Sequence, residues 1–335
     1  MTSSQLTSFL KTLKLGLSFI ESSPETLDEF YEVIETRKRN GGKRILKIPD
    51  KDLKWLQTRI LRDWFLPNYS FPKYVQGGVK RRSPRTNADC HKNCSVVLNI
   101  DLRDFFGNIT SVQVERALKR LDFPPDLRAL LTRLTTFEGS LPQGAPISTF
   151  LANLVGLELD EKLLQIAKKH SVAYSRYVDD ITFSGEPDVD VLMKEIRRCF
   201  RRSPFELNQS LTRIQRSHRR QTVNKVIVNK RVAVPTDFVR QIRHDLYYCE
   251  KFGIYGHCEE TDVESQPSFV KTLAARIGYV ISIDPEKGRS FLNQFRSLKD
   301  EQDNDKHYQK LLALRLAHNK ATTSATKSKP TQKTP

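Results

Sequence analysis

Two adjacent aspartates inside an apolar segment constrain this chain more than any other feature. Asp179 and Asp180 interrupt a stretch, residues 174–183, whose remaining pattern predicts strand, turn and strand. A third acid, Asp101, follows the apolar run at 95–100, which predicts a buried strand that ends at this aspartate. Because carboxylates in apolar surroundings need partners, the pattern predicts a sheet edge at which the three acids converge.

Three converging carboxylates fit the chemistry of phosphoryl transfer. Transfer from a nucleoside triphosphate uses two Mg²⁺ ions, about 3.5 to 4 Å apart, which activate the attacking hydroxyl and hold the leaving pyrophosphate. These hard cations bind oxygen ligands. Each acid also has a plainer interpretation, because Asp-Asp pairs are common in tight turns and a strand-end aspartate often caps the next helix. The order and apolar setting of all three favour the metal site.

The charge balance indicates a polyanionic partner. The chain has 56 Lys and Arg against 39 Asp and Glu, a formal charge of +17 and a pI near 9.7, which is typical of nucleic-acid binders. No apolar run reaches the roughly 18 residues that a membrane span needs, and the N-terminus lacks the pattern of a secretion signal. Five scattered cysteines suit reduced thiols, so we expect a cytoplasmic protein without membrane association.

The sequence pattern sets both ends of the chain apart from its middle. Residues 1–36 show helical periodicity and predict an N-terminal helical cap, and residues 318–335 predict a disordered basic tail. Between them, Asn40-Gly41 separates two strand-like runs within residues 31–49, which predicts a hairpin with a basic tip. The pattern further predicts helices over 50–66 and 146–170 and a mainly helical C-terminal part.

Three motifs resemble the polymerase signatures of reverse transcriptases. They are NIDLRDFF at 99–106, LPQGAPIS at 141–148 and YVDD at 177–180. The succession of LPQG and YVDD at this distance is highly specific. The resemblance implies an α+β fold, a right-hand polymerase with fingers and a ferredoxin-like palm over 37–235 and a helical, nucleic-acid-binding thumb over 236–317. It implies RNA-directed DNA synthesis from deoxynucleoside triphosphates.

Two further segments resemble elements of the retron branch of that family. NADCH at 87–91 matches the NAxxH element, and Val223-Asn224-Lys225 stands where retrons usually have Val-Thr-Gly, with only the valine shared. A retron enzyme would copy part of a bound structured non-coding RNA into RNA-linked single-stranded DNA (msDNA). Such systems commonly serve anti-phage defence together with a separate effector protein.

The resemblance assigns roles at the reaction centre. Asp101, Asp179 and Asp180 would bind two Mg²⁺ ions, with the main-chain carbonyl of Leu102 as an extra ligand. Lys38 and Arg44 would hold the triphosphate, Gln143 would position the nucleotide, and Phe106 would exclude a ribose 2′-hydroxyl. Each role has a plainer alternative. Lys38 and Arg44 could belong to a solvated basic turn, LPQG could be a simple loop, and Phe106 could be a core phenylalanine.

A second group of residues would contact RNA. It comprises Asn87, His91, Val223, Asn224, Lys225, Arg240 and Arg243. For His91 an ordinary buried histidine is the competing interpretation. Two other functions also stay open: a reverse transcriptase of another bacterial lineage, such as a group II intron or a diversity-generating element, and a non-catalytic RNA-binding scaffold. The NAxxH match argues against the first, and retention of three acids argues against the second.

Overall fold

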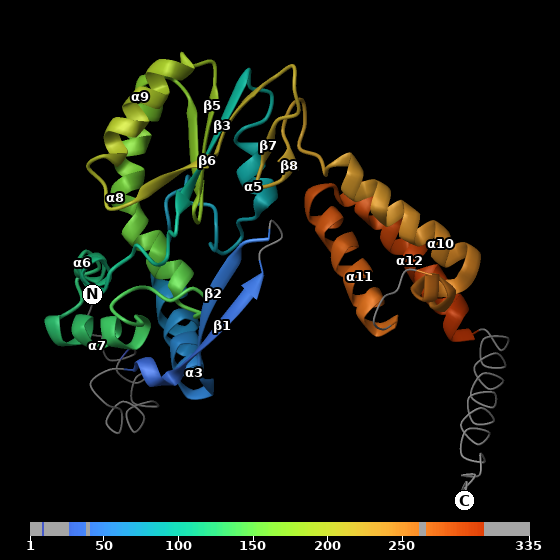
Figure 1. The fold of residues 1–335 in the computed structure, drawn as a ribbon, viewed down its shortest axis with the longest axis horizontal. Helices are drawn as coiled ribbons and strands as arrows, with labels where there is room; N and C mark the ends of the chain where they lie inside the picture. The colour runs from blue at the N-terminus through green and yellow to red at the C-terminus, as the bar shows by residue number, and fades with distance from the viewer. Residues whose placement is uncertain (1–8, 10–26, 38–40, 261–265, 305–335) are drawn as a thin grey trace, which may run out of the picture. The chain divides into compact units, whose positions relative to one another are not determined.

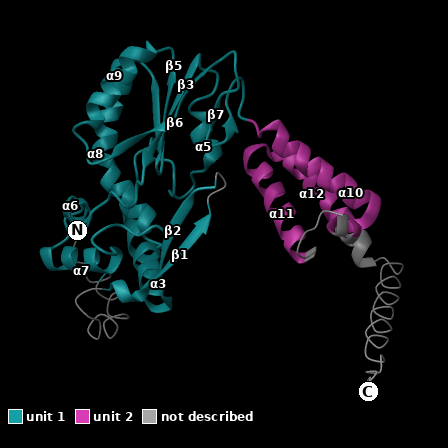
Figure 2. Ribbon diagram, in the orientation of Figure 1, with its two compact units in different colours: residues 1–232 teal, residues 233–335 magenta. Residues whose placement is uncertain are grey.

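The computed structural model describes residues 9, 27–37, 41–260 and 266–304. It divides into two compact units, Met1–Val232 and Ala233–Pro335 (Figure 2). Most of the predicted N-terminal cap and all of the predicted tail at 318–335 lie outside the described residues. Within the predicted cap, residues 28–30 form a short 3-10 helix, η1 (Asp28–Phe30), and residue 31 begins a strand.

The predicted hairpin is present. Strands β1 (Tyr31–Arg37) and β2 (Lys43–Pro49) pair antiparallel, from Tyr31 opposite Pro49 to Arg37 opposite Lys43. Residues 38–40 at its tip, including Lys38, lie outside the described residues. The helix predicted at 50–66 is found as three consecutive segments: α3 (Lys51–Arg59), the π-helix η2 (Ile60–Phe65) and α4 (Leu66–Asn68). Asp50 caps α3 by accepting a hydrogen bond from the Leu53 amide at 2.8 Å.

A four-stranded antiparallel sheet forms the centre of the first unit. Its strands are β3 (Val96–Arg103), β4 (Ala173–Tyr177), β5 (Asp180–Gly185) and β6 (Glu206–Arg216), in the order β4-β5-β3-β6. Helix α8 (Ser148–Lys169) leads from β3 toward β4, and α9 (Val189–Phe200) leads from β5 to β6. Both helices lie along the same side of the sheet (Figure 1). This connectivity is the ferredoxin-like βαββαβ arrangement, which confirms the predicted palm.

The strand that carries the first acid is longer than predicted. β3 continues past Asp101 to Arg103, because β6 pairs with it there, with Asp101 opposite Asn208 and Leu102 opposite Leu207. The register shifts between Asn99 and Asp101, an irregularity of the kind that re-aims side chains beside active sites. Asp101 therefore lies within a paired strand rather than at its end.

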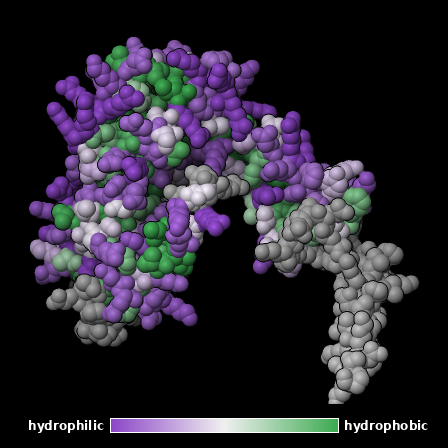
Figure 3. Space-filling view, in the orientation of Figure 1, coloured by the Kyte–Doolittle hydropathy of each residue, from purple (hydrophilic) through white to green (hydrophobic). Residues whose placement is uncertain are grey.

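The remaining elements of the first unit surround this sheet. They are α5 (Pro84–Asp89), α6 (Ser111–Lys119), α7 (Pro125–Thr135) and the small strands β7 (Thr222–Val223) and β8 (Val226–Ile227). One hydrophobic core joins sheet and helices, with Leu98, Ile100, Leu151 and Phe183 almost fully buried. Hydrophilic residues cover much of the visible surface, and the hydrophobic ones form separate patches (Figure 3).

The second unit is helical, as the sequence predicted. It contains α10 (Thr236–Glu260), α11 (Gln266–Ile283) and α12 (Pro285–Asn304), and α10 is interrupted at Gly253, whose φ is +73°. Ile242, Ile277 and Val280 are fully buried and give this unit a core of its own. Within the described ranges, none of the helices combines the length and apolar character required to cross a membrane.

Candidate active site

The sheet brings the three predicted acids together. Asp101 on β3 is the direct cross-strand partner of Asp180 on β5, so their side chains lie on the same face of the sheet. Asp179 occupies the turn before β5, and its carbonyl accepts a hydrogen bond from the Leu102 amide at 3.0 Å. This bond fixes the turn against the end of β3.

The carboxylates of Asp101, Asp179 and Asp180 repel one another. Burial, followed by repulsion from Asp179 and Asp101, raises the pKa of Asp180 to about 6. Burial also raises the pKa of Asp179, and repulsion from Asp101 adds to the effect while the nearby Arg44 opposes it. Three acids held this close favour a state in which a cation compensates their charge.

The donor set fits Mg²⁺. The three side chains offer carboxylate oxygens, which are the hard ligands that this ion prefers. Among the described residues, no group of three or more His, Cys, Asp and Glu side chains is arranged so that it could hold a metal ion. Mg²⁺ is usually bound through one or two carboxylates together with substrate phosphates rather than by an all-protein cage, so an open arrangement agrees with that use.

Two asparagines hold the acids, and sequence reasoning missed one of them. Asn208 on β6 donates from Nδ2 to Oδ1 of Asp101 at 2.9 Å. Asn224, in the turn between β7 and β8, donates from Nδ2 to Oδ2 of Asp180 at 3.2 Å. Nothing in the sequence around Asn208 indicated this contact, because it depends on the register between β3 and β6.

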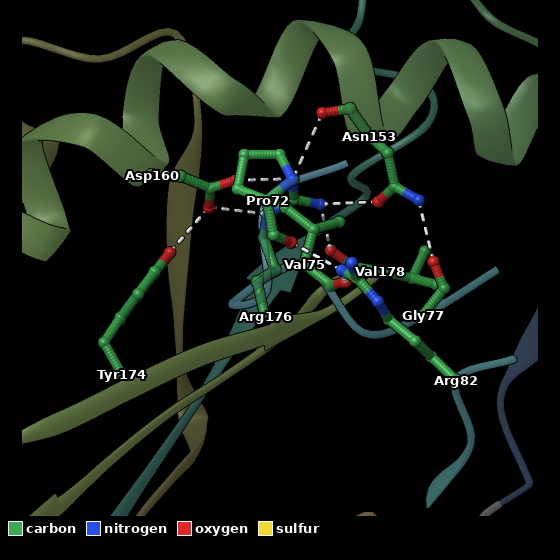
Figure 4. A network of polar contacts seen from close by, with 9 residues as sticks. All are labelled: Pro72, Val75, Gly77, Arg82, Asn153, Asp160, Tyr174, Arg176 and Val178. Atoms are coloured by element: carbon green, nitrogen blue, oxygen red, sulfur yellow. Dashed lines mark hydrogen bonds and ion pairs between the residues drawn. The ribbon is translucent and has the colours of Figure 1, made fainter. Parts of the chain in front are cut away.

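A buried network anchors the turn that carries Asp179 (Figure 4). Arg176, fully buried, donates to both carboxylate oxygens of Asp160 on α8 at 2.7 Å each and to the carbonyl of Val178 at 3.1 Å. Val178 has φ of +60°, a conformation that is costly for a β-branched residue. The bond from Arg176 to its carbonyl stabilises this strained residue directly before the acids.

The network leaves a signal in the sequence of α8. Asn153, Gly156 and Asp160 recur on one face of α8 at helical spacing, and all three are buried. Asn153 accepts from Arg176 at 2.9 Å, and a Cβ at Gly156 would lie 2.8 Å from the Arg176 guanidinium. Small and polar residues on a buried helix face indicate a buried polar partner.

Of the predicted nucleotide-binding residues, Arg44 lies near the acids. Arg44 on β2 is exposed and close enough to Asp179 to influence its pKa. The LPQG loop lies against the same strand, since the Gln143 carbonyl accepts from the Lys47 amide at 2.8 Å. Gly144, with φ of +128°, passes so close that a Cβ would lie 3.1 Å from the Lys47 carbonyl oxygen. Phe106 is half-buried just after β3, with its ring 5.9 Å from that of Phe105.

Comparison with known proteins decides the family. The profile described as reverse transcriptase (RNA-dependent DNA polymerase) matches residues 36–230. The chain belongs to the reverse transcriptase family. This confirms the membership predicted from the LPQG and YVDD motifs.

Curated relatives within the family are retron enzymes. The chain is 31% identical over 302 residues to the retron Mx162 reverse transcriptase of Myxococcus xanthus, covering 78% of this chain and 59% of the relative. It is 28% identical over 301 residues to the retron Ec86 reverse transcriptase of Escherichia coli, covering 86% and 92%. The chain thus spans about three fifths of the length of the Myxococcus relative. The predicted resemblance to retron reverse transcriptases is confirmed.

A solved structure gives a more distant likeness. Telomerase from Candida albicans, in complex with a TWJ fragment of telomeric RNA, matches with a TM-score of 0.47 and 9% identity, covering 84% of this chain and 63% of that one. No conclusion rests on this likeness.

The two predicted RNA contacts of the NAxxH element are buried. Asn87 and His91 are both 0% exposed, so neither side chain can touch RNA in this conformation. The ring nitrogens of His91 bond to the hydroxyls of Ser184 at 2.8 Å and Ser175 at 2.7 Å, which lie on β5 and β4. The expected direct contact is therefore corrected: His91 joins the two strands that flank the turn at Asp179.

The other predicted RNA contacts differ in exposure. Val223 is fully buried, Asn224 is half-buried on Asp180, and Lys225 is exposed. Of these three side chains, Lys225 is the most exposed and the most accessible to RNA. Arg240 and Arg243 are exposed on α10 of the second unit, as a phosphate-contacting role requires.

Proposed function

We propose that this protein is an RNA-directed DNA polymerase of the retron type. It copies part of a structured non-coding RNA, which it binds itself, into RNA-linked single-stranded DNA, and it serves anti-phage defence together with a separate effector protein. One observation carries the polymerase activity: Asp101 and Asp180 face each other across β3 and β5, with Asp179 adjacent. The similarity to retron reverse transcriptases supports a structured non-coding RNA as the template. The five free cysteines suit a reducing compartment such as the cytoplasm.

Two Mg²⁺ ions, held by Asp101, Asp179, Asp180 and the Leu102 carbonyl, would supply Lewis-acid activation of the attacking hydroxyl and neutralise charge on the pyrophosphate. Arg44, on the strand that Gln143 also contacts, binds the triphosphate oxygens of the incoming deoxynucleotide. Gln143 fixes the nucleotide, because its own backbone is held by Lys47. Phe106 leaves no room for a 2′-hydroxyl, which selects deoxyribose.

The roles of the residues predicted to contact RNA follow from the exposure of their side chains. Lys225, Arg240 and Arg243 contact RNA phosphates, a salt-sensitive attraction that the overall charge of +17 reinforces. Asn87 and His91 act from the interior, by fixing the elements that carry Asn224 and the catalytic turn. Sequence specificity of RNA binding must then come from neighbouring exposed groups.

Two measurements test this function. Purified protein with an RNA template, a DNA primer, deoxynucleotides and Mg²⁺ should extend the primer, and chelation with EDTA should stop extension. Nucleic acid that co-purifies from cells should contain one abundant RNA joined to DNA, which RNase and DNase each shorten. Absence of extension under both Mg²⁺ and Mn²⁺ would overturn the polymerase assignment. Extension without any co-purifying RNA-linked DNA would overturn the retron assignment alone.

A further inference from the structure

Two amide side chains approach the catalytic carboxylates from different elements. Asn208 comes from β6 and donates to Oδ1 of Asp101, whereas Asn224 comes from the β7–β8 turn and donates to Oδ2 of Asp180. Each carboxylate therefore has one oxygen occupied by an amide. Since Asp101 and Asp180 are cross-strand partners, the two amides act on neighbouring acids of one site.

Chemistry fixes the orientation of the Asn224 amide. An ionised carboxylate only accepts hydrogen bonds, so the nitrogen of Asn224 must face Asp180 and its oxygen must face away. That oxygen accepts a hydrogen bond from Nδ2 of Asn87. The two contacts are consistent only in this orientation, although nitrogen and oxygen of an amide are usually hard to tell apart.

Asn224 is held rigidly from the other side. It has φ of +46° and Lys225 has φ of +66°, which makes them the central pair of a tight turn between β7 and β8, where two positive φ angles favour Asn. Asn87, on α5, is completely buried. The chain Asn87, Asn224, Asp180 thus links a buried helix residue to a catalytic acid through two hydrogen bonds.

We propose that Asn208 and Asn224 are positioning residues for the metal-binding carboxylates. Each donates a hydrogen bond to one carboxylate oxygen, Asn208 to Asp101 and Asn224 to Asp180, and so fixes the orientation in which that carboxylate meets the cation. Asn87 holds the Asn224 amide in the orientation that makes this contact. Partners of this kind orient metal ligands, and their loss typically lowers metal affinity or activity about 10- to 100-fold. The inference deepens the proposed function and rests on Mg²⁺ binding at these acids.

The direct test replaces Asn224 without disturbing its turn. Asn224→Gly removes the amide, and glycine accepts a positive φ without strain. Asn93→Gly is the matched control, because Asn93 also has a positive φ, +57°, and no hydrogen bond from its side chain to the three acids is found among the described residues. Both variants should show the thermal melt of the wild type within a few degrees.

The readout is metal affinity, measured without turnover. Mn²⁺ is titrated by electron paramagnetic resonance into the protein bound to a dideoxy-terminated primer, an RNA template and the next deoxynucleotide. We expect the Mn²⁺ dissociation constant of Asn224→Gly to rise about tenfold or more, and that of Asn93→Gly to stay unchanged. Higher Mg²⁺ should then restore primer extension in Asn224→Gly. Unchanged Mn²⁺ affinity in a folded Asn224→Gly protein would overturn the inference, even if the wild type is an active polymerase.

A double-mutant cycle tests whether Asn87 acts on the metal site through Asn224. Asn87→Ala should weaken Mn²⁺ binding in the same direction as Asn224→Gly, and the double variant should be no weaker than Asn224→Gly alone, because both changes remove one connected path. Independent, additive losses would contradict the link. Asn208→Ala should lower Mn²⁺ affinity additively with Asn224→Gly, since it acts on Asp101 instead of Asp180. Wild-type Mn²⁺ binding without any DNA synthesis would count against the proposed function, whereas the effects of the variants would still decide the inference.

Discussion

The guanidinium of Arg176 contacts the carboxylate of Asp160 at 2.7 Å, and both side chains are fully buried. The pair joins the strand that leads into the catalytic turn to the long helix α8. Since Arg176 also donates to the Val178 carbonyl, loss of the pair should loosen the turn as well as destabilise the core.

Asp160→Asn should destabilise the protein strongly. The change leaves the buried guanidinium without its counter-charge, which typically costs about 3–5 kcal/mol. Urea unfolding followed by circular dichroism measures the effect. The control is Glu35→Gln, which breaks an exposed ion pair with Lys43, and such exposed pairs contribute little. Equal small losses for both variants would show that the buried pair does not anchor this part of the fold.

Gly156→Ala should destabilise despite the higher helix propensity of alanine. The added Cβ would lie 2.8 Å from Arg176 Cζ, so the buried guanidinium must move, at a cost of about 1–3 kcal/mol. Gly278→Ala is the matched control on α11, because a Cβ there meets nothing within 4 Å. It should be neutral or stabilising by about 0.5–1 kcal/mol. Unfolding free energies of the two variants, compared in one denaturant series, check the difference in sign.

His91 should make the protein sensitive to acid. Burial lowers its pKa from 6.5 to about 4, so the unfolded chain binds a proton between these values and the folded chain does not. The contribution of His91 to stability is therefore complete above pH 6.5 and is lost as pH falls toward 4, by up to about 1.4 kcal/mol per pH unit. Asp180, whose pKa is raised to about 6, acts in the opposite direction over part of this window.

Because Asp180 opposes the effect of His91, the contribution of His91 is measured by comparing variants that lack one histidine. His91→Gln should remove the acid-dependent slope that His91 causes, whereas the same exchange at the exposed His218 should retain it. The measurement is the unfolding free energy at several pH values between 7 and 4, chosen on the pKa values above. Identical pH profiles for wild type and His91→Gln would contradict a neutral, buried His91.

The sequence predicted three of the four strands of the sheet, all but β6 (Glu206–Arg216), because the signals for those three were local. The apolar run before Asp101, the hairpin around Asp179 and the helix after Pro146 each have a periodicity or a turn residue that determines the element. The extent of β3 was mispredicted, since its last residues are strand only through pairing with β6. Pairing between distant segments leaves no trace in the periodicity of either one.

The site was predicted less completely, for the same reason. The three acids and the neighbouring Arg44 could be identified from motifs, but Asn208 contacts Asp101 across 107 positions of sequence. Asn87 and His91 were expected to contact RNA, but both are buried, because a sequence motif does not show whether its residues are buried. Only the tertiary structure shows whether such a residue is exposed at the surface or buried in the core.

Phe106→Ala should relax sugar selection. Phe106 is half-buried next to Phe105, and its removal opens space where a 2′-hydroxyl would lie, while loss of a partly buried ring should cost less than the roughly 3–5 kcal/mol of a fully buried one. The ratio of ribonucleotide to deoxynucleotide incorporation on one RNA template measures the change, and we expect it to rise about tenfold or more. Phe105→Leu, which keeps the core filled, should leave the ratio unaltered. An unchanged ratio for Phe106→Ala would place the selection elsewhere.

The most direct test of the account is primer extension by the double variant Asp179→Asn, Asp180→Asn. These exchanges preserve the size of both side chains and remove the charges that bind the metals, while relief of the repulsion that raises the Asp180 pKa should leave the fold at least as stable. DNA synthesis on an RNA template should fall about a thousandfold or more, whereas RNA binding near physiological salt should stay within about twofold. DNA synthesis that persists in the folded double variant would contradict the assignment of these acids to the reaction centre.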